Sequence, residues 1–232
     1  MNKNLNNKYF IILNKDEIIF KCLNYNNKIS LTRNYTLKNN PDNLLEELTN
    51  FFNHNLIELE KSLKNFIKEI YIIIDTDENL SVNLSAKYKV QSEKINGQKI
   101  NDLLSTLKYQ FTKYSNDQKV IHMMISRLLV DDEEKDFLFF KEASDSLTLE
   151  VNFKCLKNKT VQFIKKLCSN YQISVKKIML VNHLRQFIEN HTDDVVIIAN
   201  KILSGEVKNE VFWITKKPIN HGFFEKFFKF FN

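Results

Sequence analysis

Hydrophobic and polar positions along the chain follow first the period of strands and then that of a helix. Short β-branched and aromatic runs at 9–13, 17–23 and 29–37, separated by Asn, Lys and Asp, predict an antiparallel meander of three strands. Apolar residues then recur at helical spacing over 44–63, and the run KEIYIIID at 68–75 predicts a buried central strand. The opening of the chain therefore predicts one sheet with a crossing helix.

A second unit is predicted to begin near residue 79. Its pattern gives, in order, a strand at 80–84, a helix at 100–111, an apolar strand at 120–126, an acidic turn at 131–134, a strand at 146–156, a helix at 160–170 and a strand at 173–181. Two short helical patterns follow, and Asp193 and Asp194 are placed to start the second of them. A polar connector with an edge-strand pattern at 211–214 comes next. Strands and helices mixed in this way predict an α/β (α+β) fold.

The last eleven residues, GFFEKFFKFFN, form a two-faced segment. At 100° per residue the phenylalanines share one arc and the charged residues lie opposite, as in a helix at a membrane interface. A helix that docks its phenylalanine face on its own domain or on a partner protein explains the pattern equally well. The candidate membrane-binding residues are Phe223, Phe224, Lys226, Phe227, Phe228, Lys229, Phe230 and Phe231.

Composition narrows the functional classes. The formal net charge of +6 permits contact with an anionic partner, but both signs are mixed along the chain and no arginine-rich or RNP-like patch exists, so nucleic acid is not an expected partner. Only three glycines are present and no P-loop or GxGxxG motif occurs, so we expect no nucleotide cofactor. Three separated cysteines fit a reducing cytosol, and without an apolar run of spanning length any membrane contact is expected to be peripheral.

Catalytic signals are weak. Asp75 and Asp77 follow an apolar strand as DxD, which is the spacing of a metal-dependent phosphoryl-transfer site, although a solvated turn explains it more simply. The acidic run at 131–134 is interpreted as a hairpin tip. The histidines are scattered without metal-ligand spacing, and His122, inside an apolar strand, is interpreted as a core histidine. We therefore predict no catalytic, cofactor or metal residues and no enzyme activity.

The order of these elements resembles the bacterial cell-division protein FtsA, an actin-like protein that tethers the division ring to the membrane. The resemblance rests on the opening meander, helix and strand at 9–75, on the stretch KVIHMMISRLLVD at 119–131 with the elements after it, and on the terminal GFFEKFFKFFN. The hairpin turn at 13–16 lacks a DxG, and nothing after Val195 resembles a second phosphate loop. The resemblance implies a reduced FtsA-like protein that lacks the second actin-type half and does not bind ATP.

The resemblance also implies an organisation and a function. We expect a partial actin-like (ribonuclease H-like) subdomain at 1–78, an inserted FtsA-type α/β subdomain at 79–182, helices at 183–203 that pack back on the first subdomain, a linker at 204–221 and an amphipathic tail helix at 222–232. The expected function is a non-enzymatic division adaptor, cytoplasmic and peripheral on the inner face of the cell membrane. Its expected partners are anionic lipid and division proteins, with self-association through the inserted subdomain; binding to FtsZ is in doubt because FtsA uses mainly the missing half for it. The alternatives are the phosphoryl-transfer enzyme and a soluble protein-interaction module.

Overall fold

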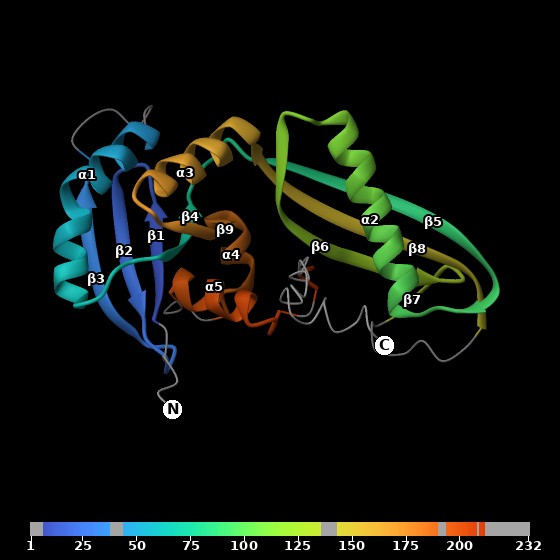
Figure 1. Ribbon diagram of the computed structural model, residues 1–232. Helices are drawn as coiled ribbons and strands as arrows, with labels where there is room; N and C mark the ends of the chain where they lie inside the picture. Colours follow the sequence, from blue (N-terminus) through green and yellow to red (C-terminus); the bar gives the residue numbers. More distant parts are fainter. Residues whose placement is uncertain (1–6, 38–43, 136–142, 190–193, 208, 212–232) are drawn as a thin grey trace, which may run out of the picture.

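The computed structural model describes residues 7–37, 44–135, 143–189, 194–207 and 209–211. These residues form two sheets, the first covered by several helices and the second crossed by one helix (Figure 1). Within these ranges no helix is both long enough and apolar enough to cross a membrane.

The first sheet has five strands in the order β3-β2-β1-β4-β9. The predicted meander is confirmed, because β1 (Lys8–Leu13), β2 (Glu17–Leu23) and β3 (Ile29–Thr36) pair antiparallel. On the other side of β1 lie β4 (Glu69–Ile74) and then β9 (Ser174–Leu180), and these three strands run parallel. Parallel strands need crossover connections, which the helices supply.

Helices cover both faces of this sheet, because neighbouring residues of a strand point to opposite sides. The odd-numbered residues of β1 from 9 onward pack toward α1 (Leu44–Leu63) and α3 (Asn158–Asn170). The even-numbered ones pack toward α4 (Val181–Leu184) and α5 (Val195–Leu203). Asp194 starts α5 as predicted, since its side chain accepts the N–H of the second helical residue at 2.9 Å. The continuous apolar runs of β1 and β4 thus reflect burial on two faces.

The second sheet is antiparallel, with the order β5-β8-β6-β7. Its strands are β5 (Leu80–Lys94), β6 (Gln118–Val130), β7 (Glu133–Glu134) and β8 (Ala143–Lys157), and α2 (Gly97–Tyr114) crosses one face (Figure 1). The core of this unit comes from α2 and from residues of β6 and β8, among them Leu104, Phe111, Ile125, Leu149 and Phe153.

The second sheet is an insertion between β4 and β9 of the first. Where the chain leaves and returns, Glu78 and Lys157 form an ion pair of 3.0 Å. The insertion ends sooner than the sequence predicts. The prediction that one inserted unit spans 79–182 is wrong for α3 and β9, because α3 contributes to the core of the first sheet and β9 is the edge strand of that sheet. Periodicity identifies a strand but not the sheet to which it hydrogen-bonds.

The order and directions of the first sheet are those of an actin-like (ribonuclease H-like) sheet. The predicted fold class, a mixed α/β fold with a partial actin-like subdomain and an inserted α/β subdomain, is therefore confirmed. The predicted tail helix at 222–232 lies outside the described residues, as does most of the predicted linker. Part of that linker does contact the body as an edge strand would: Glu210 forms an isolated antiparallel bridge with Met124 of β6.

Candidate functional site: the junction of the two sheets

The edge strand of the first sheet, β9, and strand β6 of the second sheet lie next to each other, and α3 closes the space between them. A cavity of about 130 Å³ opens at this junction. Its apolar lining comes from Val120, Ile121, Val161, Val175 and Ile178, and its polar lining comes from Lys119, Lys165, Lys176 and Lys177. We call this cavity the junction cleft. Sites for drug-sized ligands occupy roughly 300–1,000 Å³, so the junction cleft has room for little more than one side chain.

The charge of the junction cleft is positive. Lys176 is partly neutralised by an exposed ion pair with Glu69 at 2.7 Å, and the Lys177 ammonium lies 3.9 Å from a carboxylate oxygen of Glu210. Burial lowers the pKa of Lys177 to about 8, while Glu210 raises it. At neutral pH Lys177 therefore remains largely protonated, and cations line an apolar floor.

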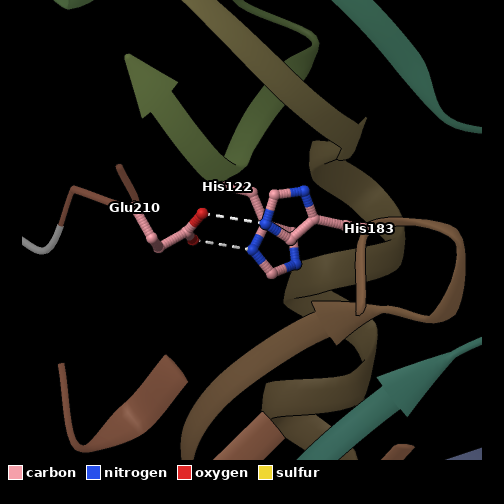
Figure 2. A group of neighbouring side chains, drawn as sticks. All are labelled: His122, His183 and Glu210. Carbon is pink, nitrogen blue, oxygen red and sulfur yellow. Dashed lines mark hydrogen bonds and ion pairs between the residues drawn. The ribbon is translucent and has the colours of Figure 1, made fainter. Parts of the chain in front are cut away.

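Behind the junction cleft, a buried group of polar side chains joins the two sheets. Figure 2 shows His122 from β6, His183 from α4 and Glu210 from the segment after α5. The two imidazole rings are stacked with centroids 3.8 Å apart. Nδ1 of His122 lies 2.9 Å from one carboxylate oxygen of Glu210, and Nε2 of His183 lies 2.8 Å from the other. Each of the three side chains is at most 1% exposed, so the group is buried away from solvent.

Backbone contacts hold Glu210 in this position. The N–H of Ile125 donates to the carbonyl of Asn209 at 3.0 Å, and the N–H of Val211 donates to the carbonyl of Met123 at 2.8 Å. Residues 209–211 therefore lie along β6 as a short added strand, and the side chain between the two bonds points into the histidine pair.

Burial and hydrogen bonding set the charges of this group. Burial raises the pKa of Glu210, but the hydrogen bonds and the electrostatic interaction with His122 and His183 outweigh it and lower the pKa to about 2. Burial also lowers the pKa of His122 to about 4, and the hydrogen bond to Glu210 opposes this only in part. At neutral pH the group is thus a carboxylate held by a neutral His122, with the Lys177 cation nearby.

The three side chains offer ligand atoms within 4.8 Å of one another, a spacing at which a cation can be surrounded. A metal-ligating histidine normally donates its second N–H to an acceptor. Nε2 of His122 instead accepts the N–H of Leu180 at 3.0 Å, which places the ring proton on Nδ1, facing Glu210. Nδ1 of His183 has no hydrogen-bond partner among the described residues. The residues therefore fit a metal poorly and fit a carboxylate between two N–H donors well.

The structure separates the carboxylates that the sequence offers for phosphoryl transfer. Asp75 accepts a hydrogen bond of 3.2 Å from Arg185 in the 3-10 helix η2 (Arg185–Phe187). Asp77 is 89% exposed and pairs with Lys15 at 2.6 Å. Asp75 is thus hydrogen-bonded to one cation and Asp77 to another, although the charge of Lys15 also acts on Asp75. In the acidic turn at 131–134, Asp131 accepts the backbone N–H groups of residues 145 and 146, as expected for a hairpin tip.

The sequence does not predict that the polar side chains of His122, His183 and Glu210 meet at the junction of the two sheets. The interpretation of His122 as a core histidine is confirmed. Its neighbours His183 and Glu210, however, lie 61 and 88 residues further along the chain. One usable signal exists. A histidine inside an apolar strand needs a buried polar partner, and Glu210 directly precedes the apolar run at 211–214, which has an edge-strand pattern. The candidate membrane-binding residues Phe223–Phe231 lie outside the described residues.

No family profile and no curated protein sequence matches the chain. Solved structures with a similar fold include a Bacteroides thetaiotaomicron protein with an actin-like ATPase fold and unknown function, which is 12% identical with a TM-score of 0.38 over 80% of this chain and 56% of that one. The PilM-PilN type IV pilus biogenesis complex is 5% identical, with a TM-score of 0.44 over 76% and 48%. The cytoplasmic domain of EpsL, an inner membrane component of the type II secretion system of Vibrio cholerae, is 9% identical, with a TM-score of 0.37 over 77% and 57%.

The chain spans about half of the length of these structures. With TM-scores of at most 0.44 and identities of at most 12%, the likenesses say nothing about function. The strand order of the first sheet, rather than these matches, is what makes the chain actin-like.

Proposed function

We propose that this protein is a non-enzymatic adaptor, similar to FtsA, that holds a division protein at the inner face of the cytoplasmic membrane. The observation that carries the proposal is the junction cleft. It combines an apolar floor with four lysines and has room for about one side chain, which suits the capture of an acidic segment of a partner protein better than the binding of a cofactor.

The tail supplies the second contact. In this proposal Phe223–Phe231 form a helix that enters the headgroup region, with Lys226 and Lys229 beside anionic lipid. A body that binds a protein and a tail that binds a membrane together make an adaptor. The pairing of Asp75 and Asp77 with separate cations supports the absence of a catalytic role for them.

Co-sedimentation with vesicles that contain anionic lipid tests the tail. We expect the intact protein to pellet with vesicles and the variant Phe227→Glu/Phe228→Glu to stay in the supernatant, because charge on the apolar face opposes insertion. The matched control Phe227→Leu/Phe228→Leu keeps the apolar face and should still pellet. Equal binding by the intact protein and the glutamate variant would remove the membrane role, and tail-dependent binding to proteins without lipid binding would favour the soluble interaction module.

Fluorescent fusions in the native cell test the adaptor role. The intact chain is expected at mid-cell on the membrane, and a chain that ends at Asn220 is expected to be diffuse. The variant Lys119→Glu/Lys165→Glu reverses charge in the junction cleft but leaves the tail intact, so it should stay on the membrane and spread away from mid-cell. Retention of this variant at mid-cell would show that the junction cleft does not bind the division partner.

Nucleotide binding gives a further prediction. ATP with Mg²⁺ is expected to leave the melting temperature unchanged, since the hairpin tip where an actin-like fold would hold phosphate carries Lys15 in an ion pair with Asp77 and no glycine loop. Differential scanning fluorimetry measures this directly, with sodium triphosphate as the control for non-specific anion binding. An ATP-dependent rise beyond that of triphosphate would contradict the prediction.

A further inference from the structure

We propose that His122, His183 and Lys177 form a carboxylate-binding site whose ligand is the chain's own Glu210, and that this contact fastens the C-terminal segment to both sheets. We call the contact the Glu210 latch. Its parts come from four places in the chain: β6 of the second sheet, β9 and α4 on the first, and the segment after α5.

Hydrogen bonding identifies the ligand as an anion. The N–H of Leu180 takes the acceptor position of His122, so that ring can only donate toward Glu210. With the rings stacked at 3.8 Å, the donors of His122 and His183 point at the two oxygens of one carboxylate. Two converging donors and a nearby ammonium require an acceptor that carries negative charge, and a carboxylate matches their spacing.

Because Glu210 is buried, releasing it from the two histidines is unfavourable. The Glu210 side chain has 0% exposure, so its release would leave two imidazole groups facing a vacated space inside the protein. The latch also anchors only three described residues, 209–211, through two backbone hydrogen bonds to β6. Glu210 and the packing of Val211 on the core of the second sheet therefore fix this short segment. Without the segment, the edge of β6 at Met123 and Ile125 would be open for another strand.

Acid does not open the latch under physiological conditions. The groups that face it are His122 from β6, His183 from α4 and Lys177 from β9. The pKa of Glu210 is about 2 and that of His122 about 4, while Lys177 has a pKa of about 8. A partner protein or tension on the tail, rather than a change of pH, would have to release it.

The latch sets how far the tail can reach, a consequence that rests on the proposed membrane role of residues 222–232. With the latch closed, residues 212–221 separate Val211 from the tail, and ten residues span at most about 35 Å. With it open, the connection starts after Val207, which packs on the core of the first sheet, and the fourteen residues 208–221 span at most about 50 Å. The closed latch thus keeps the junction cleft close to the membrane.

Chemical rescue tests the carboxylate site. In the full-length variant Glu210→Ala, acetate is expected to restore part of the lost melting temperature in a saturable way, relative to chloride at the same ionic strength. Acetate should have no such effect on the wild type or on Glu210→Gln, in which the position stays filled. Equal effects of acetate and chloride on Glu210→Ala would overturn the proposal. So would a zinc-dependent rise of the wild-type melting temperature that Glu210→Gln abolishes, because it would indicate a metal site.

Histidine tautomers test the site without any variant, should Glu210→Ala fail to fold. Long-range ¹H–¹⁵N correlation spectra of the wild type are expected to show the proton of His122 on Nδ1 and that of His183 on Nε2. A His122 ring protonated only on Nε2 could not donate to Glu210 and would overturn the proposal.

The reach of the tail is measured separately by energy transfer from a dye at Tyr114→Cys, an exposed position on α2, to dye-labelled lipid; the three native cysteines are buried. Transfer should be weaker for Glu210→Ala than for the otherwise identical protein, while both bind vesicles equally. Equal transfer would overturn the link between latch and tail. Failure of both proteins to bind vesicles would instead refute the membrane role, and acetate rescue would still decide the carboxylate site.

Discussion

Replacing His122 with leucine is expected to lower the free energy of unfolding by about 3 kcal/mol. The change removes the acceptor of the Leu180 N–H and one donor to Glu210, and each buried polar group left without a partner costs roughly 1–3 kcal/mol. For a protein of this size the melting temperature should fall by about 6–12 °C. Urea unfolding followed by circular dichroism measures the change.

The matched control is His54→Leu. His54 lies on the exposed side of α1, where its Nδ1 is hydrogen-bonded to the carbonyl of Asn50, one turn earlier in the helix. Surface changes of this kind are usually worth within about 0.5 kcal/mol. If the two variants lose the same stability, the hydrogen bonds of His122 contribute nothing and the structural role assigned to the junction is wrong.

The wild-type protein is expected to lose about 3 kcal/mol of stability as the pH falls from 6.5 to 4. The unfolded chain takes up a proton on His122 near pH 6.5, whereas in the folded protein burial lowers the pKa of this histidine to about 4. The unfolded state therefore binds more protons in this window, and stability decreases as the pH falls. A difference of one pKa unit corresponds to about 1.4 kcal/mol.

Below about pH 4.5, protonation of Glu210 in the unfolded chain lowers the stability further. Its pKa is about 2 in the folded protein and 4.5 in the reference state, so the unfolded chain gains a proton that the folded chain does not. Urea midpoints across the pH range measure both effects. The His122→Leu variant should lack the decline between pH 6.5 and 4 while His54→Leu keeps it, and parallel curves for all three proteins would show that another group causes the acid sensitivity.

The Glu210 contact affects the distance between the body of the proposed adaptor and its tail. Without the Glu210 contact the distance between the body and the tail would be loosely set, because the fourteen residues 208–221 can span about 50 Å. The Glu210 latch shortens the connection and starts it next to the strand that also lines the junction cleft. Lys177 belongs to both features, since it lines the junction cleft and lies 3.9 Å from the Glu210 carboxylate. Binding of an acidic segment and release of the latch would therefore affect each other through this cation.

The local elements and their buried faces follow from the sequence alone. The opening meander, α1 and the central strand β4 follow from the spacing of apolar residues, and the start of α5 follows from the capping tendency of Asp194, because helix and strand periods depend only on nearby residues. The meander, helix and strand at 9–75 also resemble the start of FtsA, and this resemblance implied the actin-like subdomain.

The sheet that each later strand joins, and the polar side chains that meet, depend on contacts between segments far apart in the sequence. The sequence pattern of β9 would be the same whether it paired with β4 or ended the inserted unit. Its hydrogen bonds to β4 place it in the first sheet. His122, His183 and Glu210 share no spacing in the sequence, and they converge because β6, α4 and residues 209–211 meet where the insertion folds back against β9. The hydrogen bonds among these three side chains are also strengthened by burial, because no water competes for them. Removal of one of these side chains would leave a polar atom of another without that partner.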